Sequence, residues 1–414
     1  MNNPLVLEEH QSFEDAVNVS LKEKGISLRP PDFLKEPEYL GIYNNCASYY
    51  IGAAWLVQKE WAVVVHPKVQ NVDFVQMFLS ALAVDTQNES DYFSKCYGIK
   101  FDEPLIETDE QLNQLTPLLV LHYISLLDRL VKRGLKKGYV DREENLKSKL
   151  KGRIVISRHL NKNVFQQRND RVFCKFQEYT ADFPENRLLK KALLLSERLV
   201  DQYSSLKKQI EATDVPFRIA NLKASFQNVS DNIEIWEVKN LSTNNLFKEH
   251  SRAVMVAKML LRRFDYSISN ASIERNTTPP FWIDMSRLYE MWVWKKLTDN
   301  SLNKVLFQEN GFYGRQVADF VVRDEKLILD AKYKLNYAND SFVNINDIRE
   351  ISGNARDESL LPNIPDDYSP RCVIIYPGDN DELKNEAVEP FDKQGVKISH
   401  YRNFYKISIP LPKN

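Results

Sequence analysis

The sequence contains little glycine, few cysteines and no long apolar run. The 12 glycines are scattered and no repeat period or low-complexity tract is visible, which excludes a repeat architecture. The 4 cysteines lie far apart without a CxxC pair, which favours reduced thiols in a cytoplasmic protein over a disulfide framework or a zinc site. No apolar stretch is long enough to span a bilayer, and the N-terminal residues lack the features of a secretory signal. We therefore expect a cytoplasmic protein without membrane contact.

Two further absences concern ligands. The formal net charge is −1, so the molecule as a whole is not an electrostatic binder of nucleic acid, and any DNA contact must come from a local patch or a partner. No G-x-x-x-x-G-K-[ST] motif occurs, so the chain lacks the usual phosphate loop for a nucleoside triphosphate. If its activity is coupled to nucleotide hydrolysis, another polypeptide must supply the motor.

The residues that are present indicate a globular protein with more than one domain. Hydrophobic residues make up 43% and charged residues 27% of the chain, and 414 residues suggest two or three domains. Alternation of apolar and polar residues over 38–70 predicts a hairpin or small β-module. Helical spacing predicts helices over 112–134, 186–210 and 253–264. Consecutive prolines in NTTPPFWID (276–284) predict a boundary.

Beyond this boundary the pattern predicts a mixed α/β layout. The expected order is helix (285–298), three strands (304–309, 316–322 and 326–334), helix (344–357), strand (371–376) and strands near 395–409. Helices interspersed with strands in this order are typical of a mixed sheet with helices on its faces.

Residues 131–170 form a basic segment with two open interpretations. They hold twelve Lys and Arg against four acids, a local balance of +8. Such a segment can track the DNA backbone, because each phosphate that is neutralised releases counterions. It can equally be a solvated face without a ligand.

The stretch ADFVVRDEKLILDAKYK (318–334) carries charged residues on two otherwise apolar strands. A turn at 323–326 places Asp319 directly opposite Asp330, and alternation puts Lys332 on the same face. Two opposed carboxylates repel each other by up to about 1 kcal/mol. A divalent cation bound between them would make their arrangement favourable instead. Mg²⁺ prefers such hard oxygen ligands, and a nearby lysine could polarise a water or neutralise charge on a phosphate.

The alternative for this hairpin is a solvent-facing edge whose charges only keep it soluble. The neighbours of Asp330 argue against that, since Ile328, Leu329 and Ala331 are typical of a buried strand.

Asp319 followed by Asp330-Ala331-Lys332 resembles the active-site signature of PD-(D/E)XK nucleases. Over roughly residues 50–360 the chain also resembles the McrC family, the nuclease subunits of McrBC-type, modification-dependent restriction systems. Four further segments carry this resemblance: YIGAAWLVQKEWAVVVHPK (50–68), LKGRIVIS (150–157), CKFQEYTADFPENRLLKKAL (174–193) and DMSRLYEMWVWKKL (284–297).

The resemblance implies a site. Asp319 and Asp330 would be metal ligands, helped by the backbone carbonyl of Ala331, and Lys332 would be the catalytic lysine. Glu290 matches the helix acid that many of these nucleases place beside the metal, although it could also be a solvated helix glutamate.

One position departs from the family pattern. Relatives often carry a glutamine-bearing helix after the motif, and Glu350 of DIREISGNAR stands at that position. Glu350 is therefore left outside the predicted site.

The resemblance also implies the domain organisation of an α+β multidomain chain. Residues 1–110 would be a β-rich, partner-binding N-terminal module, and 111–275 a mainly helical central region that includes the basic segment. Residues 276–414 would be a PD-(D/E)XK α/β endonuclease core with a mixed sheet.

The function implied is that of an endonuclease subunit that hydrolyses DNA phosphodiesters with Mg²⁺. Its partner would be a McrB-like AAA+ ring that binds GTP, since this chain has no nucleotide site, and the N-terminal module would insert into the ring and stimulate hydrolysis. The substrate would be modified double-stranded DNA, and pairing of two complexes would permit double-strand cleavage. The alternatives are a catalytically inactive regulatory or adaptor subunit of the ring, and a standalone nuclease.

Overall fold

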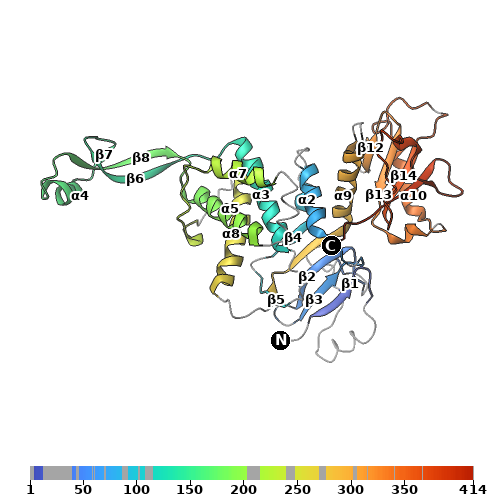
Figure 1. Ribbon diagram of the computed structural model, residues 1–414, viewed down its shortest axis with the longest axis horizontal. Helices are drawn as coiled ribbons and strands as arrows, with labels where there is room; N and C mark the ends of the chain where they lie inside the picture. Colours follow the sequence, from blue (N-terminus) through green and yellow to red (C-terminus); the bar gives the residue numbers. More distant parts are fainter. Residues whose placement is uncertain are drawn as a thin grey trace. The chain divides into compact units, whose positions relative to one another are not determined.

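The computed structural model describes most of the chain. The described residues are 4–12, 40–42, 46–57, 59, 61–69, 71–85, 92–100, 103–107, 115–202, 215–238, 248–269, 277–301, 305–314, 316–339, 341–365 and 367–413. Parts of several predicted elements, at 38–39, 43–45, 58, 60, 70, 112–114, 203–210, 276 and 304, lie outside them. The chain forms two compact units, Met1–Leu115 with Arg275–Asn414, and Thr116–Glu274 (Figure 1). Among the described residues, no helix combines the length and the apolar character needed to cross a bilayer.

The first unit contains a five-stranded sheet in the order β1–β3–β2–β10–β4. Its strands are β1 (Leu5–Glu8), β2 (Tyr50–Val57), β3 (Trp61–His66), β4 (Tyr97–Ile99) and β10 (Phe281–Asp284). β2 and β3 pair antiparallel, which confirms the predicted hairpin. β10 comes from beyond the predicted boundary, yet it pairs with both β2 and β4. The N-terminal and C-terminal segments therefore share this sheet. The division into domains 1–110, 111–275 and 276–414 stays a prediction.

The structure explains why position 52, in the segment 50–68 that carries part of the family resemblance, is a glycine. Its φ is +140°, and a Cβ at this position would lie 2.1 Å from the carbonyl oxygen of Phe281. Only glycine lets β10 approach β2 this closely.

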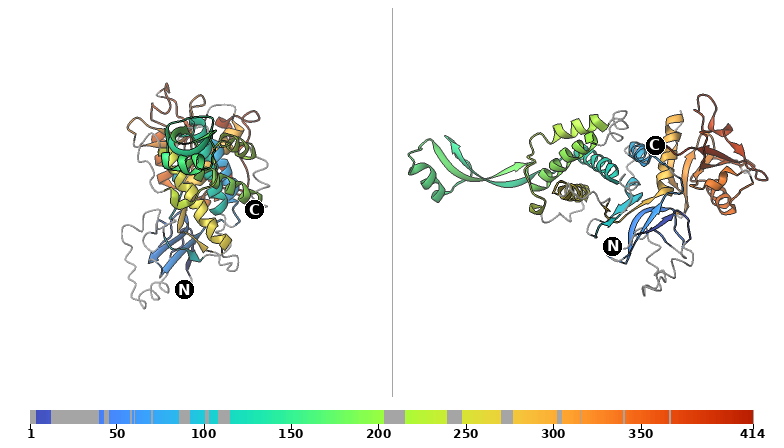
Figure 2. Two further views of the ribbon diagram at one scale, coloured as in Figure 1. Left: turned by 90° about the vertical axis from the view of Figure 1, so that its left-hand side faces the viewer. Right: turned by 60° about the horizontal axis from the view of Figure 1, so that its bottom comes forward.

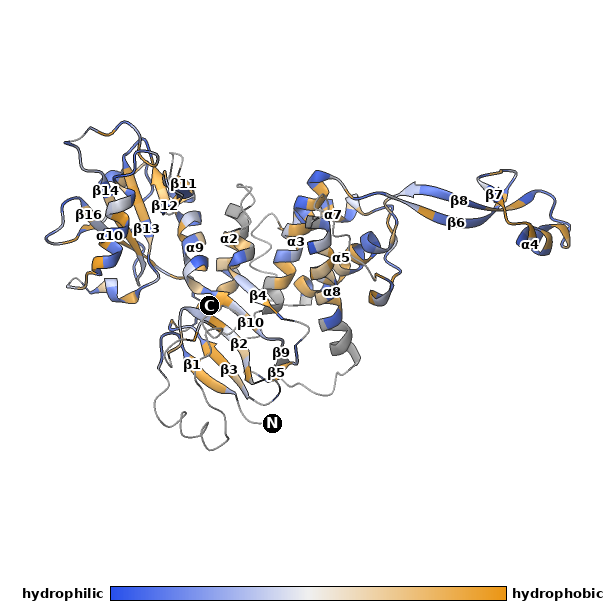
Figure 3. Ribbon diagram, turned by 180° about the vertical axis from the view of Figure 1, so that it is seen from behind, coloured by the Kyte–Doolittle hydropathy of each residue, from blue (hydrophilic) through white to orange (hydrophobic). Residues whose placement is uncertain are grey.

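The second sheet of this unit has the order β11–β12–β13–β14–β16–β15. Its strands are β11 (Leu306–Asn310), β12 (Val317–Val322), β13 (Leu327–Ala331), β14 (Arg371–Pro377), β15 (Val396–Lys397) and β16 (Phe404–Ile409). The β13–β14 and β14–β16 pairs are parallel and the other pairs are antiparallel, so the predicted mixed sheet is confirmed. Figure 3 shows how hydrophobic its central strands are.

Helices complete the first unit. They are α2 (Phe74–Asp85), α9 (Met285–Asn300), α10 (Ile345–Asn354) and the 3-10 turns Phe93–Lys95, Leu335–Ala338 and Phe391–Lys393. A small pair, β5 (Ile106–Glu107) with β9 (Thr277–Thr278), adds to it. α9 begins where the Asp284 side chain accepts a hydrogen bond from the N–H of Arg287, an N-cap that ends β10 and starts the helix. The predicted helices over 285–298 and 344–357 are confirmed.

The second unit is a group of helices with a long hairpin. The helices are α3 (Leu115–Arg133), α5 (Pro184–Gln202), α7 (Val215–Ser225), the 3-10 turn Ile235–Glu237 and α8 (Lys248–Ser269). Buried leucines and valines on α3, α5 and α8 form the core of the group. The three long helices predicted from apolar spacing are therefore present.

The hairpin was not predicted, because residues 138–180 lack an apolar alternation. β6 (Gly138–Lys147) pairs with β8 (Arg171–Thr180), and β7 (Arg153–Ile154) adds a short third strand. The segment between β7 and β8 forms the helical turns α4 (Ile156–His159) and Leu160–Val164. The hairpin extends away from the helices of its own unit (Figures 1 and 2), and no residue of β6 is buried. β6 is half-buried and exposed without a buried face, and its mostly polar sequence therefore resembles a loop.

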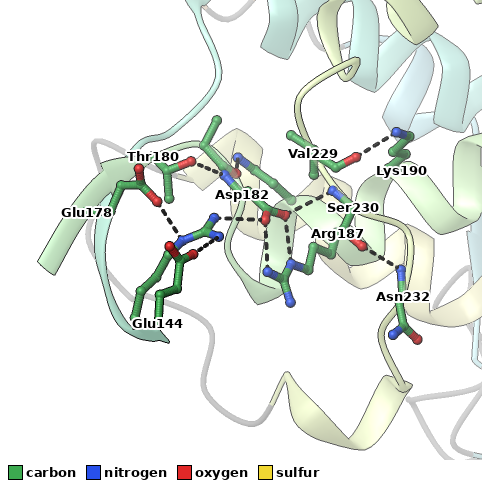
Figure 4. A network of polar contacts seen from close by, with 12 residues as sticks. Glu144, Glu178, Thr180, Asp182, Arg187, Lys190, Val229, Ser230 and Asn232 are labelled. Atoms are coloured by element: carbon green, nitrogen blue, oxygen red, sulfur yellow. Dashed lines mark hydrogen bonds and ion pairs between the residues drawn. The ribbon is translucent and has the colours of Figure 1, made fainter. Parts of the chain in front are cut away.

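A polar network ties the root of the hairpin to α5 (Figure 4). Asp182 follows β8, and its carboxylate accepts hydrogen bonds from the guanidinium of Arg187 at 2.7 and 2.9 Å and from the N–H of Ser230 at 2.9 Å. Arg142 of β6 lies 2.6 Å from Glu178 of β8 and 3.4 Å from Asp182. The segment 174–193, which carries part of the family resemblance, thus stabilises the joint between the base of the β6–β8 hairpin and α5.

Candidate active site

The charged hairpin of the sequence analysis is formed by β12 and β13. Phe320 pairs with Leu329, so Asp319 and Asp330 stand opposite each other one position farther along the ladder. The strands are linked there by the Ala331 N–H, which donates a hydrogen bond of 2.9 Å to Asp319 Oδ2. The predicted register is therefore confirmed.

Asp330 lies in a buried strand. All five residues of β13 are buried, and Asp330 itself is 2% exposed. Ile328 shares its face of the strand and belongs to a core that α10 covers with Ile348 and Ile351. The solvent-facing alternative for this hairpin is therefore wrong.

Lys332 follows β13 directly and is held between two acids. Its N–H donates to the carbonyl oxygen of Ile375 at 2.8 Å, which fixes the backbone. Its Nζ lies 3.0 Å from Asp330 Oδ2 and 2.8 Å from Glu350 Oε2. The Lys332 side chain is 17% exposed, whereas Glu350 lies at the surface of α10.

Glu290 approaches the same place from α9. The Gln308 amide nitrogen lies 3.2 Å from Glu290 Oε2 and 3.0 Å from Asp319 Oδ1, and it donates to both. The hydroxyl of Tyr92 donates a further hydrogen bond to Glu290 Oε2. The structure thus brings together Glu290, Asp319, Asp330 and Lys332, and Glu290 is not the solvated helix glutamate of the alternative interpretation.

Burial controls the protonation of these acids. Burial raises the pKa of Asp319 to about 7, and the neighbouring Glu290 carboxylate acts in the same direction. Burial likewise raises the pKa of Glu290 to about 7, against the hydrogen bond from Tyr92. The pKa of Asp330 is raised well above its usual range by burial and by the charge of Asp319. Burial opposes the charge of Lys332, but the Asp330 carboxylate raises the pKa of Lys332 on balance.

These residues suit a hard divalent cation. Among the described residues no group of three or more His, Cys, Asp or Glu is arranged as a metal site. The candidate set is instead two carboxylates, Asp319 and Asp330, with the carbonyl of Ala331, which is the number of carboxylates by which proteins usually hold Mg²⁺. Burial raises the pKa of both Asp319 and Asp330 because it disfavours their charged forms, and a cation between them would favour those forms again.

Three residues of this neighbourhood were not among the predicted site residues. Glu350 departs from the family pattern, and neither Gln308 nor Tyr92 belongs to a predicted motif. Gln308 could have been found, since it lies opposite Asp319 on the adjacent strand. No sequence pattern around Tyr92 indicates its contact with Glu290, because the two residues lie 198 positions apart in the sequence.

The basic segment 131–170 lies largely on the hairpin of the second unit. Several of its cations face acids there: Lys147 lies 3.9 Å from Asp170, Lys151 lies 3.7 Å from Glu178, and Arg158 pairs with Glu143. Others remain exposed, so DNA backbone binding by this segment stays a prediction.

Comparison with known proteins gives one family match. A sequence model of the family described as McrBC 5-methylcytosine restriction system component matches residues 47–349, which is more than half of the 414 residues. Comparison with curated proteins finds no match.

Two solved assemblies show a structural likeness. One is a half-complex of Thermococcus gammatolerans McrB AAA+ hexamers with bound McrC, at 15% identity, with 99% of this chain and 95% of that chain covered and a TM-score of 0.41. The other is the Thermococcus gammatolerans McrBC complex, at 16% identity, with 74% and 90% covered and a TM-score of 0.32. Both likenesses are weak, and the family assignment comes from the family match alone.

Proposed function

The chain belongs to the McrBC 5-methylcytosine restriction system component family, and we propose that it is the Mg²⁺-dependent endonuclease subunit of such a system. The observation that carries the proposal is the convergence of Glu290, Asp319, Asp330 and Lys332 around the ends of buried strands. Buried acids and a lysine in one cluster are costly for a fold and are typical of a functional site. A PD-(D/E)XK-type nuclease core would use such a cluster for phosphodiester hydrolysis.

Each side chain has a distinct task in this proposal. Asp319 and Asp330 would hold Mg²⁺ together with the Ala331 carbonyl, and the bound cation would polarise the phosphate and acidify a water. Lys332 brings a positive charge beside Asp330, where it can neutralise charge that develops on the phosphate oxygens as the P–O bond breaks. Glu290 adds a third carboxylate next to Asp319.

The partner in this proposal is a McrB-like AAA+ ring that hydrolyses GTP, and the substrate is modified double-stranded DNA. The family match and the lack of a phosphate-loop motif in this sequence support it. In the Thermococcus gammatolerans assembly, McrC is bound to McrB AAA+ hexamers. Two paired complexes would cut both strands.

Two surfaces of this chain are candidates for contact with the ring. The first is the N-terminal segment 1–110. The second is the outer end of the β6–β8 hairpin, where Ile156 is 70%, Phe165 74% and Val164 45% exposed. Exposed apolar side chains gathered at one place are typical of a protein-binding surface. Ile156→Ser with Phe165→Ser should lower stimulation of GTP hydrolysis if the hairpin makes the contact, and should leave it unchanged if residues 1–110 make it alone.

The nuclease assignment is tested with the chain and its AAA+ partner on DNA that contains 5-methylcytosine, with GTP and Mg²⁺. Asp330→Ala and Lys332→Ala should each lower the cleavage rate by at least about 100-fold. Asp324→Ala, in the exposed turn of the same hairpin, is the matched control and should cut normally. Normal cutting by Asp330→Ala and Lys332→Ala would overturn the assignment.

The same assay separates the enzyme from a catalytically inactive regulatory subunit. A regulator would stimulate GTP hydrolysis and show no Mg²⁺-dependent nicking with wild-type protein. The presence of both acids and the lysine in one cluster favours the enzyme.

A further inference from the structure

Gln308 has an unusual backbone for a residue within a strand. Its φ is +52°, in the left-handed region that side chains other than glycine seldom adopt. The ladder between β11 and β12 is regular on both sides of it, through Phe307 with Phe320 and Glu309 with Ala318. Such a conformation is strained and persists only where the surroundings hold it in place.

The residue before Gln308 is packed against α9 and β12. The ring of Phe307 stacks on Trp294 of α9 with a centroid distance of 4.0 Å and lies 5.6 Å from the ring of Phe320. β11 is thereby fixed to α9 immediately before the unusual residue, and the turn in the backbone directs the Gln308 amide between α9 and β12.

The Gln308 amide spans two acids that come from different elements. Its nitrogen lies 3.2 Å from Glu290 Oε2 on α9 and 3.0 Å from Asp319 Oδ1 on β12. An amide nitrogen carries two hydrogens and no charge, so it can donate to both carboxylates at once. A lysine here would compete with a cation for the same carboxylates, and a glutamate would add repulsion.

Tyr92 holds the same carboxylate from another direction. Its hydroxyl donates to Glu290 Oε2, its ring meets Phe307 edge-on at 5.0 Å, and the guanidinium carbon of Arg287 lies 5.4 Å from the ring centroid. Tyr92 belongs to the N-terminal segment 1–110, so that segment reaches the candidate active site.

We propose that Gln308 is a positioning residue that fixes Glu290 relative to Asp319, with Tyr92 as its second support. This inference rests on the proposed nuclease function and adds to it two residues outside the resemblance to known nucleases. Neither touches the substrate in this proposal, because they act by holding carboxylates that a cation requires in a set geometry.

The test uses Gln308→Asn in the full chain. Asparagine tolerates the left-handed backbone at least as well as glutamine, but it is one methylene shorter and cannot span both carboxylates. Gln316→Asn, the same change at an exposed glutamine before β12, is the matched control. Tyr92→Phe removes the hydroxyl and keeps the ring.

Metal affinity is the first measurement, by Mn²⁺ titration of the chain alone followed by electron paramagnetic resonance. Gln308→Asn should weaken Mn²⁺ binding about 10-fold, and Tyr92→Phe should weaken it less, because Gln308 still holds Glu290. With the AAA+ partner present, the Mg²⁺ concentration for half-maximal cleavage should rise by the same factors, whereas the thermal midpoint should stay at the wild-type value. Gln316→Asn should equal wild type in all three measurements.

Two outcomes are distinguishable by including Asp330→Ala. If that variant loses Mn²⁺ binding while Gln308→Asn and Tyr92→Phe bind as wild type does, the positioning role is overturned and the nuclease assignment stands. If Asp330→Ala itself binds Mn²⁺ and cuts normally, the proposed function fails instead. Should Gln308→Asn unfold, Tyr92→Phe decides: an unchanged Mn²⁺ affinity then counts against the proposal.

Discussion

The ammonium group of Lys332 donates a hydrogen bond of 2.8 Å to the carboxylate of Glu350. Two residues farther along, Lys334 Nζ lies 2.7 and 2.8 Å from the two carboxylate oxygens of Asp347, which is buried. Glu350 and Asp347 are three residues apart on α10, so they form neighbours on one face of the helix. α10 therefore fixes the segment that follows β13 by two ion pairs, and one of them involves the predicted catalytic lysine.

Glu350 should be replaceable by the glutamine that related proteins carry. We expect Glu350→Gln to keep the cleavage rate within about threefold of wild type, because its amide oxygen can still accept the hydrogen bond from Lys332. Glu350→Ala should lower the rate by about 10-fold, since the lysine loses a fixed partner. Cleavage at saturating Mg²⁺ measures both. Glu358→Gln, a change in the loop after α10, is the control, and equal rates for all three variants would contradict the role given to Glu350.

Replacement of Gly52 should disrupt the five-stranded sheet. A Cβ at this position would meet the Phe281 carbonyl oxygen at 2.1 Å, so Gly52→Ala should destabilise the first unit by about 3 kcal/mol or more. Gly314→Ala is the matched control, because Gly314 also has a positive φ of +64° but open space around it. It should cost only about 1 kcal/mol. Urea unfolding of both variants measures the difference, and equal costs would show that backbone conformation alone explains Gly52.

Stability of the second unit should fall in mild acid because of His250. Burial lowers the pKa of His250 to about 4, with Lys136 acting in the same direction, and its Nε2 lies 2.9 Å from Asn186 Oδ1. In the unfolded chain the His250 side chain takes up a proton near pH 6.5, whereas in the folded chain it does so only near pH 4. The stability that the neutral side chain contributes is therefore complete above pH 6.5 and is lost as the pH falls towards 4. The loss should approach about 3 kcal/mol.

His250→Gln provides the comparison, because glutamine can donate to Asn186 and does not titrate. Urea unfolding at pH 7 and pH 4.5 should show a smaller acid effect in this variant than in wild type. The same pH dependence in both proteins would mean that other groups cause it.

Asp182 should be essential to the joint at the root of the hairpin. Asp182→Asn removes the negative charge of the carboxylate that accepts hydrogen bonds from Arg187 and from the Ser230 N–H. We expect this change to lower the free energy of unfolding of the second unit by about 1.5–3 kcal/mol. The Asp182 side chain is 13% exposed, whereas that of Asp141 on β6 is 53% exposed and pairs with Lys175 at 3.3 Å. Asp141→Asn, the matched control, should leave the urea midpoint almost unchanged, because solvent screens an exposed pair. Equal effects of the two changes would contradict the role of the joint.

The sequence predicted the second sheet of the first unit closely. Short apolar strands with turns between them permit few registers, and only one of these puts Asp319 opposite Asp330 with both carboxylates on the face that carries Ile328. Four predicted site residues therefore came together, three of them from the stretch 318–334 and Glu290 from α9. The β6–β8 hairpin was not predicted because no residue of β6 is buried and the β6 sequence carries no apolar alternation.

The sequence by itself determined the strands and helices whose apolar faces repeat with a regular period, the spacing of the two acids and the lysine, and the family. Only the tertiary structure decided which distant residues complete the site. Gln308 acts through a backbone turn that no propensity predicts, and Tyr92 reaches Glu290 across 198 residues. The physical reason is that periodic burial is a local property of the chain, whereas a hydrogen bond between distant segments exists only after the sheets and helices have packed.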